Sequence, residues 1–406
     1  MSDVQGQGPG EGRPRPTIGR GLTFLFAVAA GAAVGNLYWA QPLLDLIARD
    51  LGESTADAGW LVTTTQLGYA LGILLVVPLG DVTNRRRLVP LSLLAAAVAL
   101  GLCALAPSFG FLVAALGLVG LVTVGGQLLT PLAGDLATDA DRGAVVGTVV
   151  SGILTGILLS RTVSGFVADA FGWRAIYVGA GVLDVVLAVL LWRAIPDLEP
   201  KARVRYPALI RSVFTAIRRE RVVRWTLVLA GLGFGLFTMF WTALTFLLSS
   251  PPFSYSVSTI GLFGLVGLVG AVAAQRAGRL HDAGWSVRAS GLGWALVVVA
   301  FGLAALAGRS VVLVVVAILL LDVAIQGVNI LNQTRMFAVS GEARSRLNTA
   351  FVTSNFLCGA VGSVLASVLW SAGGWPAVTL CGAGLALVAL VVWAFGRRGP
   401  LVVPAS

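Results

Sequence analysis

A stripe of polar side chains in an otherwise apolar segment is the clearest chemical feature of this 406-residue chain. Asp322, Gln326, Asn329 and Gln333 are spaced by four, three and four positions, which places them on one face of a helix. Such a stripe faces water, a ligand or other polar groups, because polar groups are costly to expose to hydrocarbon. A carboxyl group in a desolvated cavity holds a proton more tightly than in water, so Asp322 is a candidate for proton or substrate handling. The alternative is a structural hydrogen bond to another helix.

Two further ionisable residues fall inside apolar segments. Arg161 stands between Ser160 and Thr162, and Asp184 lies in the next apolar run. A guanidinium group stays charged, so Arg161 needs a partner or a path to water. It can pair with Asp322, bind an anionic group of a substrate, extend to the surface, or pair with Asp184. We expect Asp322 and Arg161 to form a proton-coupling site.

A second group of polar and aromatic side chains, spread over other apolar segments, predicts the walls of a substrate cavity. Together with the three amides of the stripe, its members are Asn36, Tyr38, Gln41, Gln66, Gln127, Trp241, Thr242 and Asn355. Aromatic walls with a few uncharged polar points suit apolar or cationic organic molecules. The alternative for each aromatic residue is ordinary helix packing. Pro131 predicts a bend in the helix that carries Gln127.

The elements that must position these residues are apolar runs, each about long enough to cross a bilayer. Their approximate ranges are 21–43, 59–80, 88–106, 110–132, 145–168, 174–192, 225–248, 258–280, 288–307, 311–334, 349–370 and 375–395. In a bilayer every backbone polar group must be satisfied internally, and these runs lack the alternation of barrel strands. The sequence therefore predicts an all-α membrane protein with twelve transmembrane helices.

The positive charges predict how the chain is oriented. If the N-terminus is cytoplasmic, 24 of the 28 Lys and Arg residues fall in cytoplasmic loops and tails. This bias predicts that both termini are cytoplasmic, with the basic loops against the lipid bilayer. The net charge of +10 is thus no sign of nucleic-acid binding. We expect no enzymatic activity, metal or cofactor, because no phosphate-binding GxxxxGK[ST] motif, metal-type cluster or nucleophile–base pair is present.

A basic segment divides the apolar runs into two groups of six. The expected units are a cytoplasmic tail 1–20, a six-helix bundle 21–192, a basic cytoplasmic linker 193–224, a second six-helix bundle 225–396 and a cytoplasmic tail 397–406. Residues 207–220 of the linker predict an amphipathic helix at the membrane interface. A constant offset of 202 positions aligns Trp39 with Trp241 and Gly59 with Gly261. That offset predicts two parallel repeats with a substrate site between them.

Loops and helices of the chain resemble those of the major facilitator superfamily. The loop PLGDVTNRRRLV is similar to the superfamily motif G-x-L-a-D-R-x-G-R-K, with Asp81 in the acidic position and Arg85 and Arg86 in basic ones. The second-half loop AGRLHDAG keeps Gly278 and Asp282. The stretch TVVSGILTGILLSRTVSG resembles the glycine-rich helix 5 of drug:proton antiporters, and the chain is similar to a bacterial efflux-type branch of the superfamily.

The resemblance implies two pseudo-symmetric bundles with the substrate cavity between them. It places the helix of Asp322 at the cavity and the helix of Asp184 at the periphery, where a structural role is favoured. It also implies a cytoplasmic gate in which the arginines of the first loop pair with Asp135. The gate residues are Asp81, Arg85, Arg86, Asp135, Gly278 and Asp282. The alternative is that the arginines only fix the topology.

These features predict a proton-coupled secondary transporter of the bacterial inner membrane. We expect a monomer that exports small organic molecules by alternating access, with a small-molecule substrate and protons as its partners. One alternative is a sugar or amino-acid exporter or importer of the same fold. A more distant one is a membrane sensor or scaffold that transports nothing.

Overall fold

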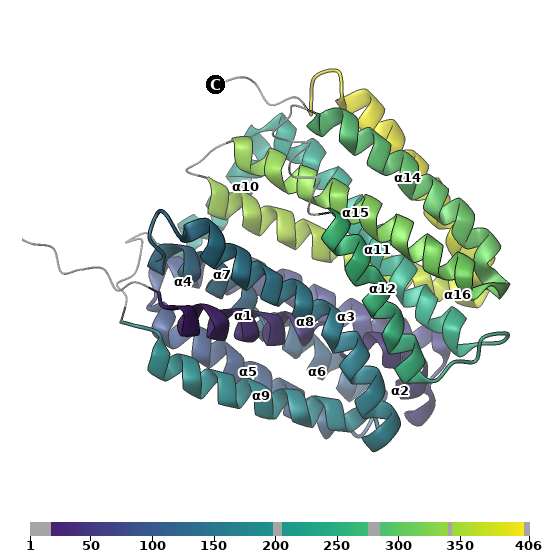
Figure 1. The fold of residues 1–406 in the computed structure, drawn as a ribbon, viewed down its shortest axis with the longest axis horizontal. Helices are drawn as coiled ribbons and strands as arrows, with labels where there is room; N and C mark the ends of the chain where they lie inside the picture. The colour runs from purple at the N-terminus through teal and green to yellow at the C-terminus, as the bar shows by residue number, and fades with distance from the viewer. Residues whose placement is uncertain (1–17, 198–204, 275–284, 340–342, 402–406) are drawn as a thin grey trace, which may run out of the picture.

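The computed structural model of the protein describes residues 18–197, 205–274, 285–339 and 343–401. All the regular secondary structure in these ranges is helical, which agrees with the predicted fold class (Figure 1). The helices are α1 (Arg20–Gly35), η1 (Gln41–Leu43), α2 (Leu44–Asp50), α3 (Thr55–Leu75), α4 (Leu79–Val82), α5 (Arg85–Ala104), α6 (Phe109–Val122), α7 (Gly125–Leu136), α8 (Arg142–Phe171), α9 (Trp173–Ala194), α10 (Tyr206–Arg219), α11 (Arg221–Ser249), α12 (Val257–Ala274), α14 (Ser286–Leu306), η2 (Ala307–Arg309), α15 (Val311–Val339) and α16 (Arg344–Gly396).

Within the described ranges, nine helical stretches are long and apolar enough to cross a membrane, and two more apolar helices are shorter. The chain is therefore an all-α membrane protein, while the count of twelve spans stays a prediction. The last two expected spans both lie in α16, which is kinked at Gly373 and Gly374. Gly374 has a positive φ of 63°, a conformation that glycine adopts without steric cost.

The first expected span is interrupted in its middle. Helix α1 ends at Gly35, a turn follows, and the chain becomes helical again at Gln41. Pro42 lacks a backbone N–H and disfavours a helical residue before it, so one continuous helix over 21–43 is disfavoured. A second interruption separates α6 from α7 at Thr123, whereas Pro131 lies inside α7. The hydroxyl group of Thr123 donates to the backbone oxygen of Ala33, which holds the two interruptions together.

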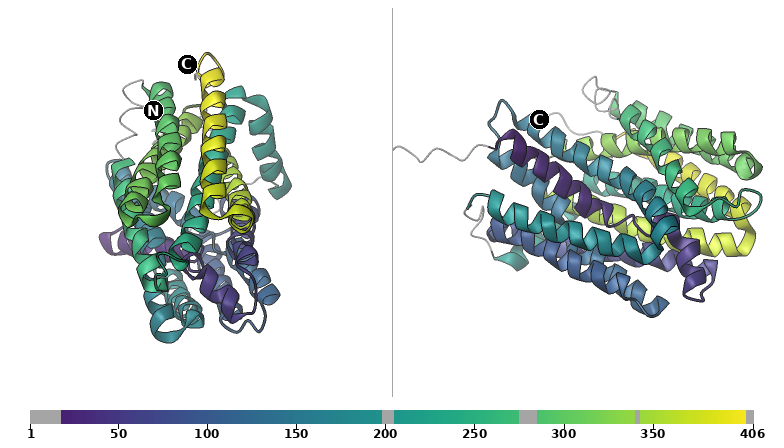
Figure 2. Two further views of the ribbon diagram at one scale, coloured as in Figure 1. Left: turned by 90° about the vertical axis from the view of Figure 1, so that its right-hand side faces the viewer. Right: turned by 60° about the horizontal axis from the view of Figure 1, so that its bottom comes forward.

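The helices form two groups that lie side by side (Figures 1 and 2). Helices α1 to α9 make up the N-terminal half, in which α1 packs on α8, α3 on α6 and α5 on α9. Helices α10 to α16 make up the C-terminal half, in which α11 packs on α16 and α14 on α15. The halves meet through α3 with α16 and α8 with α12. We call the end with Arg20, α10 and Arg397 the linker end, and the end with α2 the distal end.

Small residues let α8 approach its neighbours. An added Cβ at Gly156 would lie 2.1 Å from the backbone oxygen of Gly31, so α1 and α8 are in backbone contact. Between the halves, an added Cβ at Gly59 would lie 3.1 Å from the backbone oxygen of Ser363, and one at Gly261 would lie 2.6 Å from that of Arg161. The offset of 202 relates both members of these two contacts, so the repeat in the sequence corresponds to paired packing at the distal end.

The linker contains the expected amphipathic helix. Helix α10 buries Val213 and leaves Phe214 half exposed. Its first residue, Tyr206, donates a hydrogen bond of 2.5 Å from its hydroxyl group to the backbone oxygen of Leu75 at the end of α3. The linker is therefore anchored to the N-terminal half while α10 packs on α16 and α11 of the C-terminal half.

Candidate functional site

Asp322 lies on α15 in the interior of the protein, with only 3% of its surface exposed. Its Oδ1 atom accepts a hydrogen bond of 3.2 Å from the indole Nε1 of Trp241 on α11. Its Oδ2 atom lies against Gly267 of α12, where an added Cβ would come within 2.5 Å. Among the described residues no Lys or Arg lies within 4.0 Å of this carboxyl group. A single donor therefore serves a buried carboxyl group.

Arg161 lies on α8 of the other half and is equally buried, at 3% exposure. Its Nε atom donates a hydrogen bond of 2.8 Å to Oε1 of Gln41. The guanidinium carbon lies 4.5 Å from the centre of the Trp241 ring and 5.0 Å from that of Tyr38. These rings attract the cation through their electron-rich faces. The Nη2 atom has no hydrogen-bond partner among the described residues.

Trp241 lies between these two side chains, which do not form a direct ion pair in the described structure. Its N–H group points to Asp322 while its ring lies against Arg161. Two glycines of α12 give the charged side chains room, since an added Cβ at Gly264 would lie 3.2 Å from Cβ of Arg161, and one at Gly267 would meet Asp322. The site is thus assembled from both halves, with an aromatic ring between the cation and the carboxyl group.

Asp184 does not pair with Arg161. It is fully buried on α9 and accepts a hydrogen bond of 2.8 Å from Nδ2 of Asn36, at the end of α1. Asn36 follows the end of α1, at the interruption of the first expected span. The sequence pattern predicts one continuous helix there and so does not predict this contact.

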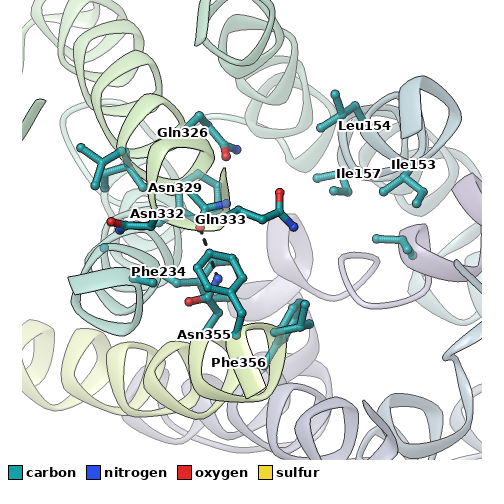
Figure 3. A pocket seen from close by; sticks show the side chains of 18 of the residues that line it. Ile153, Leu154, Ile157, Phe234, Gln326, Asn329, Asn332, Gln333, Asn355 and Phe356 are labelled. Carbon is teal, nitrogen blue, oxygen red and sulfur yellow. Dashed lines mark hydrogen bonds between the residues drawn. The ribbon is translucent and has the colours of Figure 1, made fainter. Parts of the chain in front are cut away.

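A cavity of about 210 Å³ lies between the halves (Figure 3). Its residues on α15 follow Asp322 in the chain, toward the linker end. Six of the predicted cavity residues line it: Tyr38, Gln127, Gln326, Asn329, Gln333 and Asn355. Nδ2 of Asn355 donates to Oδ1 of Asn329 at 3.3 Å. Oε1 of Gln127 accepts from Nδ2 of Asn348 at 3.4 Å, a contact between the halves. The described lining residues carry amides, aromatic rings and aliphatic side chains, and none of them is charged.

Five predicted cavity residues lie elsewhere. Asn36 binds Asp184, while Gln41 and Trp241 contact Arg161. Nε2 of Gln66 donates to the hydroxyl group of Thr238 at 3.4 Å across the halves, and Thr242 is fully buried. These five residues lie in contacts between helices. Their assignment to the cavity was wrong because helical position alone does not distinguish a face that lines a cavity from a face that packs on another helix.

The cavity also contains Phe356, Ile153, Ile157 and Asn332, which the sequence did not lead us to assign to it. Phe356 packs edge-on against Tyr69, with ring centres 4.5 Å apart, and lies 4.8 Å from Phe234. Ile153 and Ile157 form the opposite wall (Figure 3). Asn332 follows the predicted residue Asn329 by three positions, and Phe356 follows the predicted residue Asn355 directly. The cavity face is therefore wider than the single row of polar residues used to predict it.

The gate residues of the N-terminal half lie together at the linker end. Nη1 of Arg85 contacts Oδ2 of Asp135 at 2.6 Å, and its Nη2 contacts Oδ1 of Asp81 at 3.4 Å. The Nε atom of Arg85 donates to the backbone oxygen of Gly80 at 2.7 Å. All three contacts of this buried arginine lie within the N-terminal half. The backbone N–H of Arg86 donates to Oδ1 of Asn84, whose side chain caps the start of α5. Two other expected gate residues, Gly278 and Asp282, lie outside the described residues.

The described ranges contain no cluster of three or more His, Cys, Asp or Glu side chains that could hold a metal ion. The site between the halves combines the buried carboxyl group of Asp322, the buried guanidinium group of Arg161 and the cavity beside them.

Comparison with known proteins agrees with this architecture. The family model described as Major Facilitator Superfamily matches residues 23–363. The uncharacterized transporter YgaY of Escherichia coli O157:H7 is 42% identical over 381 residues, covering 94% of this chain and 97% of that protein. A Streptomyces coelicolor protein named "Probable transporter SCO4007" is 34% identical, covering 89% and 85% respectively. The crystal structure of a bacterial homologue of the lysosomal transporter Spinster superposes with a TM-score of 0.77 at 14% identity, over 96% and 98% of the two chains.

The chain therefore belongs to the major facilitator superfamily. It is a multi-pass membrane transporter and has no enzymatic role.

Proposed function

We propose that the chain is a proton-coupled secondary transporter that exports small organic molecules across the bacterial inner membrane as a monomer. Asp322 binds and releases the coupling proton. Arg161 and Trp241 set the electrostatic surroundings of that proton, and the cavity beside them receives the substrate. Alternating access moves the predicted bundles 21–192 and 225–396 against each other.

The observation that carries this proposal is the position of Asp322. A buried carboxyl group with one indole donor and no ion-pair partner within 4.0 Å in the described ranges is costly to ionise. Its direct neighbours Trp241 and Gly267 belong to the C-terminal half, whereas Arg161 belongs to the N-terminal half, so a movement of one half against the other changes the distance between Arg161 and Asp322. Proton binding and the relative position of the halves are therefore linked.

The same position supports coupling to the substrate. Gln326 follows Asp322 by one helical turn and lines the cavity. Trp241 likewise lies one turn beyond Phe237, another cavity residue. The charged residues thus separate the cavity from the closely packed distal end. Aromatic rings and amides without charge favour amphipathic molecules, and the row of amides on α15 also favours a neutral, hydroxyl-rich substrate such as a sugar.

Orientation and direction rest on the sequence. We propose that the linker end is cytoplasmic, because described basic residues such as Arg20, Arg86 and Arg397 lie at this end. Export is proposed because the helix around Arg161 resembles helix 5 of drug:proton antiporters.

The test is transport by the purified protein in proteoliposomes that contain a pH-sensitive dye. Ethidium represents an aromatic cation and glucose a neutral, hydroxylated molecule. We expect Asp322→Asn to abolish transport driven by a pH gradient while exchange of internal for external label persists. The matched control is Asp139→Asn, since the side chain of Asp139 is 96% exposed at the linker end. Equal pH-driven transport by the two variants would exclude Asp322 as the coupling group.

A further inference from the structure

Asp184 is a second buried carboxyl group, and the transport site described above does not use it. It lies in the interior of the N-terminal half with no exposed surface. Oδ2 accepts one hydrogen bond from Asn36, and Oδ1 has no partner among the described residues. Asp184 thus faces the point where the first span is interrupted.

The direction of this hydrogen bond is fixed by a neighbour. The indole Nε1 of Trp39 donates to Oδ1 of Asn36 at 2.8 Å, and an indole can only donate. The amide oxygen of Asn36 therefore faces Trp39, and its NH₂ group faces Asp184. That NH₂ group also donates to the hydroxyl group of Thr123 at 3.2 Å, which in turn donates to the backbone oxygen of Ala33. Among the described residues, the carboxyl group of Asp184 thus receives one hydrogen bond, from the NH₂ group of Asn36.

No cation offsets a charge at this position within the described part of the chain. Helix α9 packs on α1, α5 and α8. The titratable or charged side chains of these elements are Arg20 of α1, Arg85, Arg86, Arg87 and Cys103 of α5, Arg142, Arg161 and Asp169 of α8, and Arg174, Tyr177 and Arg193 of α9 itself. Arg161 is directed at Gln41, and the other arginines lie at the helix ends. Cys103 and Tyr177 are buried and offer no positive charge.

We propose that Asp184 is a proton-binding site of the N-terminal half, distinct from Asp322, and that it carries a proton on Oδ1 in the conformation seen here. A carboxylate with one donor and no cation is unfavourable in the membrane interior, whereas a neutral carboxylic acid needs no counter-charge. A metal ion such as Na⁺ would not replace the proton, because the NH₂ group of Asn36 faces the site where an oxygen ligand would be required.

The proton on Asp184 acts on the first span. Asn36 begins the turn that carries Tyr38 and Gln41, and both of these residues contact Arg161. Loss of the proton leaves a charge that recruits further donors or water, and the turn is the adjacent segment able to supply them. Ionisation of Asp184 thereby alters how Arg161 is held, through Asn36 and the turn, without any contact between the two charged groups.

Infrared spectroscopy of the full chain in lipid nanodiscs tests this inference independently of transport. At neutral pH we expect Asp184→Asn to remove one C=O stretching band of a protonated carboxylic acid, a band that shifts in D₂O. Asn36→Ser leaves Asp184 in place and removes the donor to Oδ2, so the same band should move to higher frequency. Asp322→Asn serves as the control and should leave this band unchanged, which separates the inference from the proposed function.

Either of two infrared results would overturn the inference. One is that Asp184→Asn loses a band of an ionised carboxylate and keeps the band of the protonated acid. The other is that Asn36→Ser, which leaves Asp184 unchanged, gives the same spectrum as the wild type. As a second readout, hydrogen exchange of residues 36–43, corrected for its intrinsic pH dependence, should accelerate with rising pH in the wild type and stay constant in Asp184→Asn. Equal profiles for both proteins would also contradict the inference.

Discussion

Replacing Gly261 by alanine should weaken the contact between α12 and α8 at the distal end. The added Cβ would lie 2.6 Å from the backbone oxygen of Arg161, closer than such atoms approach in folded proteins. A backbone oxygen cannot rotate away as a side chain can, so one helix must retreat from the other. The strain exists only while the distal end is closed, and the substitution therefore favours conformations in which this end is open.

The magnitude follows from the packing. Inserting a methyl group into a closely packed contact costs about 1 to 3 kcal/mol. Since about 1.4 kcal/mol changes an equilibrium tenfold, the ratio of open to closed molecules should rise about 5- to 150-fold. Gly59→Ala should act in the same direction, because its added Cβ would meet the Oγ atom of Ser367 and the backbone oxygen of Ser363. Gly302→Ala is the neutral control, since no atom lies within 4 Å of its added Cβ.

Accessibility of the cavity from the distal side is the measurement. A cysteine at position 326 in the cavity, in a protein with Cys103, Cys358 and Cys381 replaced by alanine, can be labelled by a membrane-impermeant thiol reagent added outside intact cells. We expect the labelling rate to rise with Gly261→Ala by about the factor given above. A rate equal to that of the Gly302→Ala control would refute the assignment of this contact as the distal closure.

Two further predictions concern an ion pair at the distal end, Asp50 with Arg174, and one at the linker end, Arg85 with Asp135. Hydrogen bonds from the indole group of Trp173 and, second, from Arg174 lower the pKa of Asp50 below its ordinary value. The stability that these bonds provide is present above the pKa of Asp50 in the unfolded chain. It is lost as the pH falls through the lower pKa of Asp50 in the folded protein. The melting temperature of the wild type should therefore fall more steeply on acidification than that of Asp50→Asn, and parallel curves would contradict this. Arg85→Met should lower the free energy of unfolding by about 1 to 3 kcal/mol, because it leaves Asp135 without its 2.6 Å contact. Thermal unfolding in detergent checks this value, and an unchanged melting temperature would show that the pair is not stabilising.

Local rules predicted the parts of the site that depend on one helix. Gln326, Asn329 and Gln333 line the cavity together because α15 is regular over that stretch, so their spacing determines their face. The linker helix was likewise predictable from the alternation of basic and apolar residues in one segment. Hydrophobicity alone identified the all-α membrane class.

The rest depends on contacts between distant segments. The interruption after Gly35 places Asn36 against Asp184, a contact across 148 positions that no local pattern encodes. Arg161 contacts the rings of Trp241 and Tyr38 and the amide of Gln41, and Trp241 in turn donates to Asp322. Several side chains compete for one buried cation, and only the packed structure decides which of them reach it.

The paired contacts at the distal end also separate what the packing requires from what the charge of Arg161 adds. Gly59 meets Ser363 where Gly261 meets Arg161, so a small neutral residue and a guanidinium occupy equivalent places in a duplicated framework. The closure works through backbone approach in both copies and does not require the charge. The two repeats therefore share one packing geometry, and only the N-terminal repeat places a cation at this position.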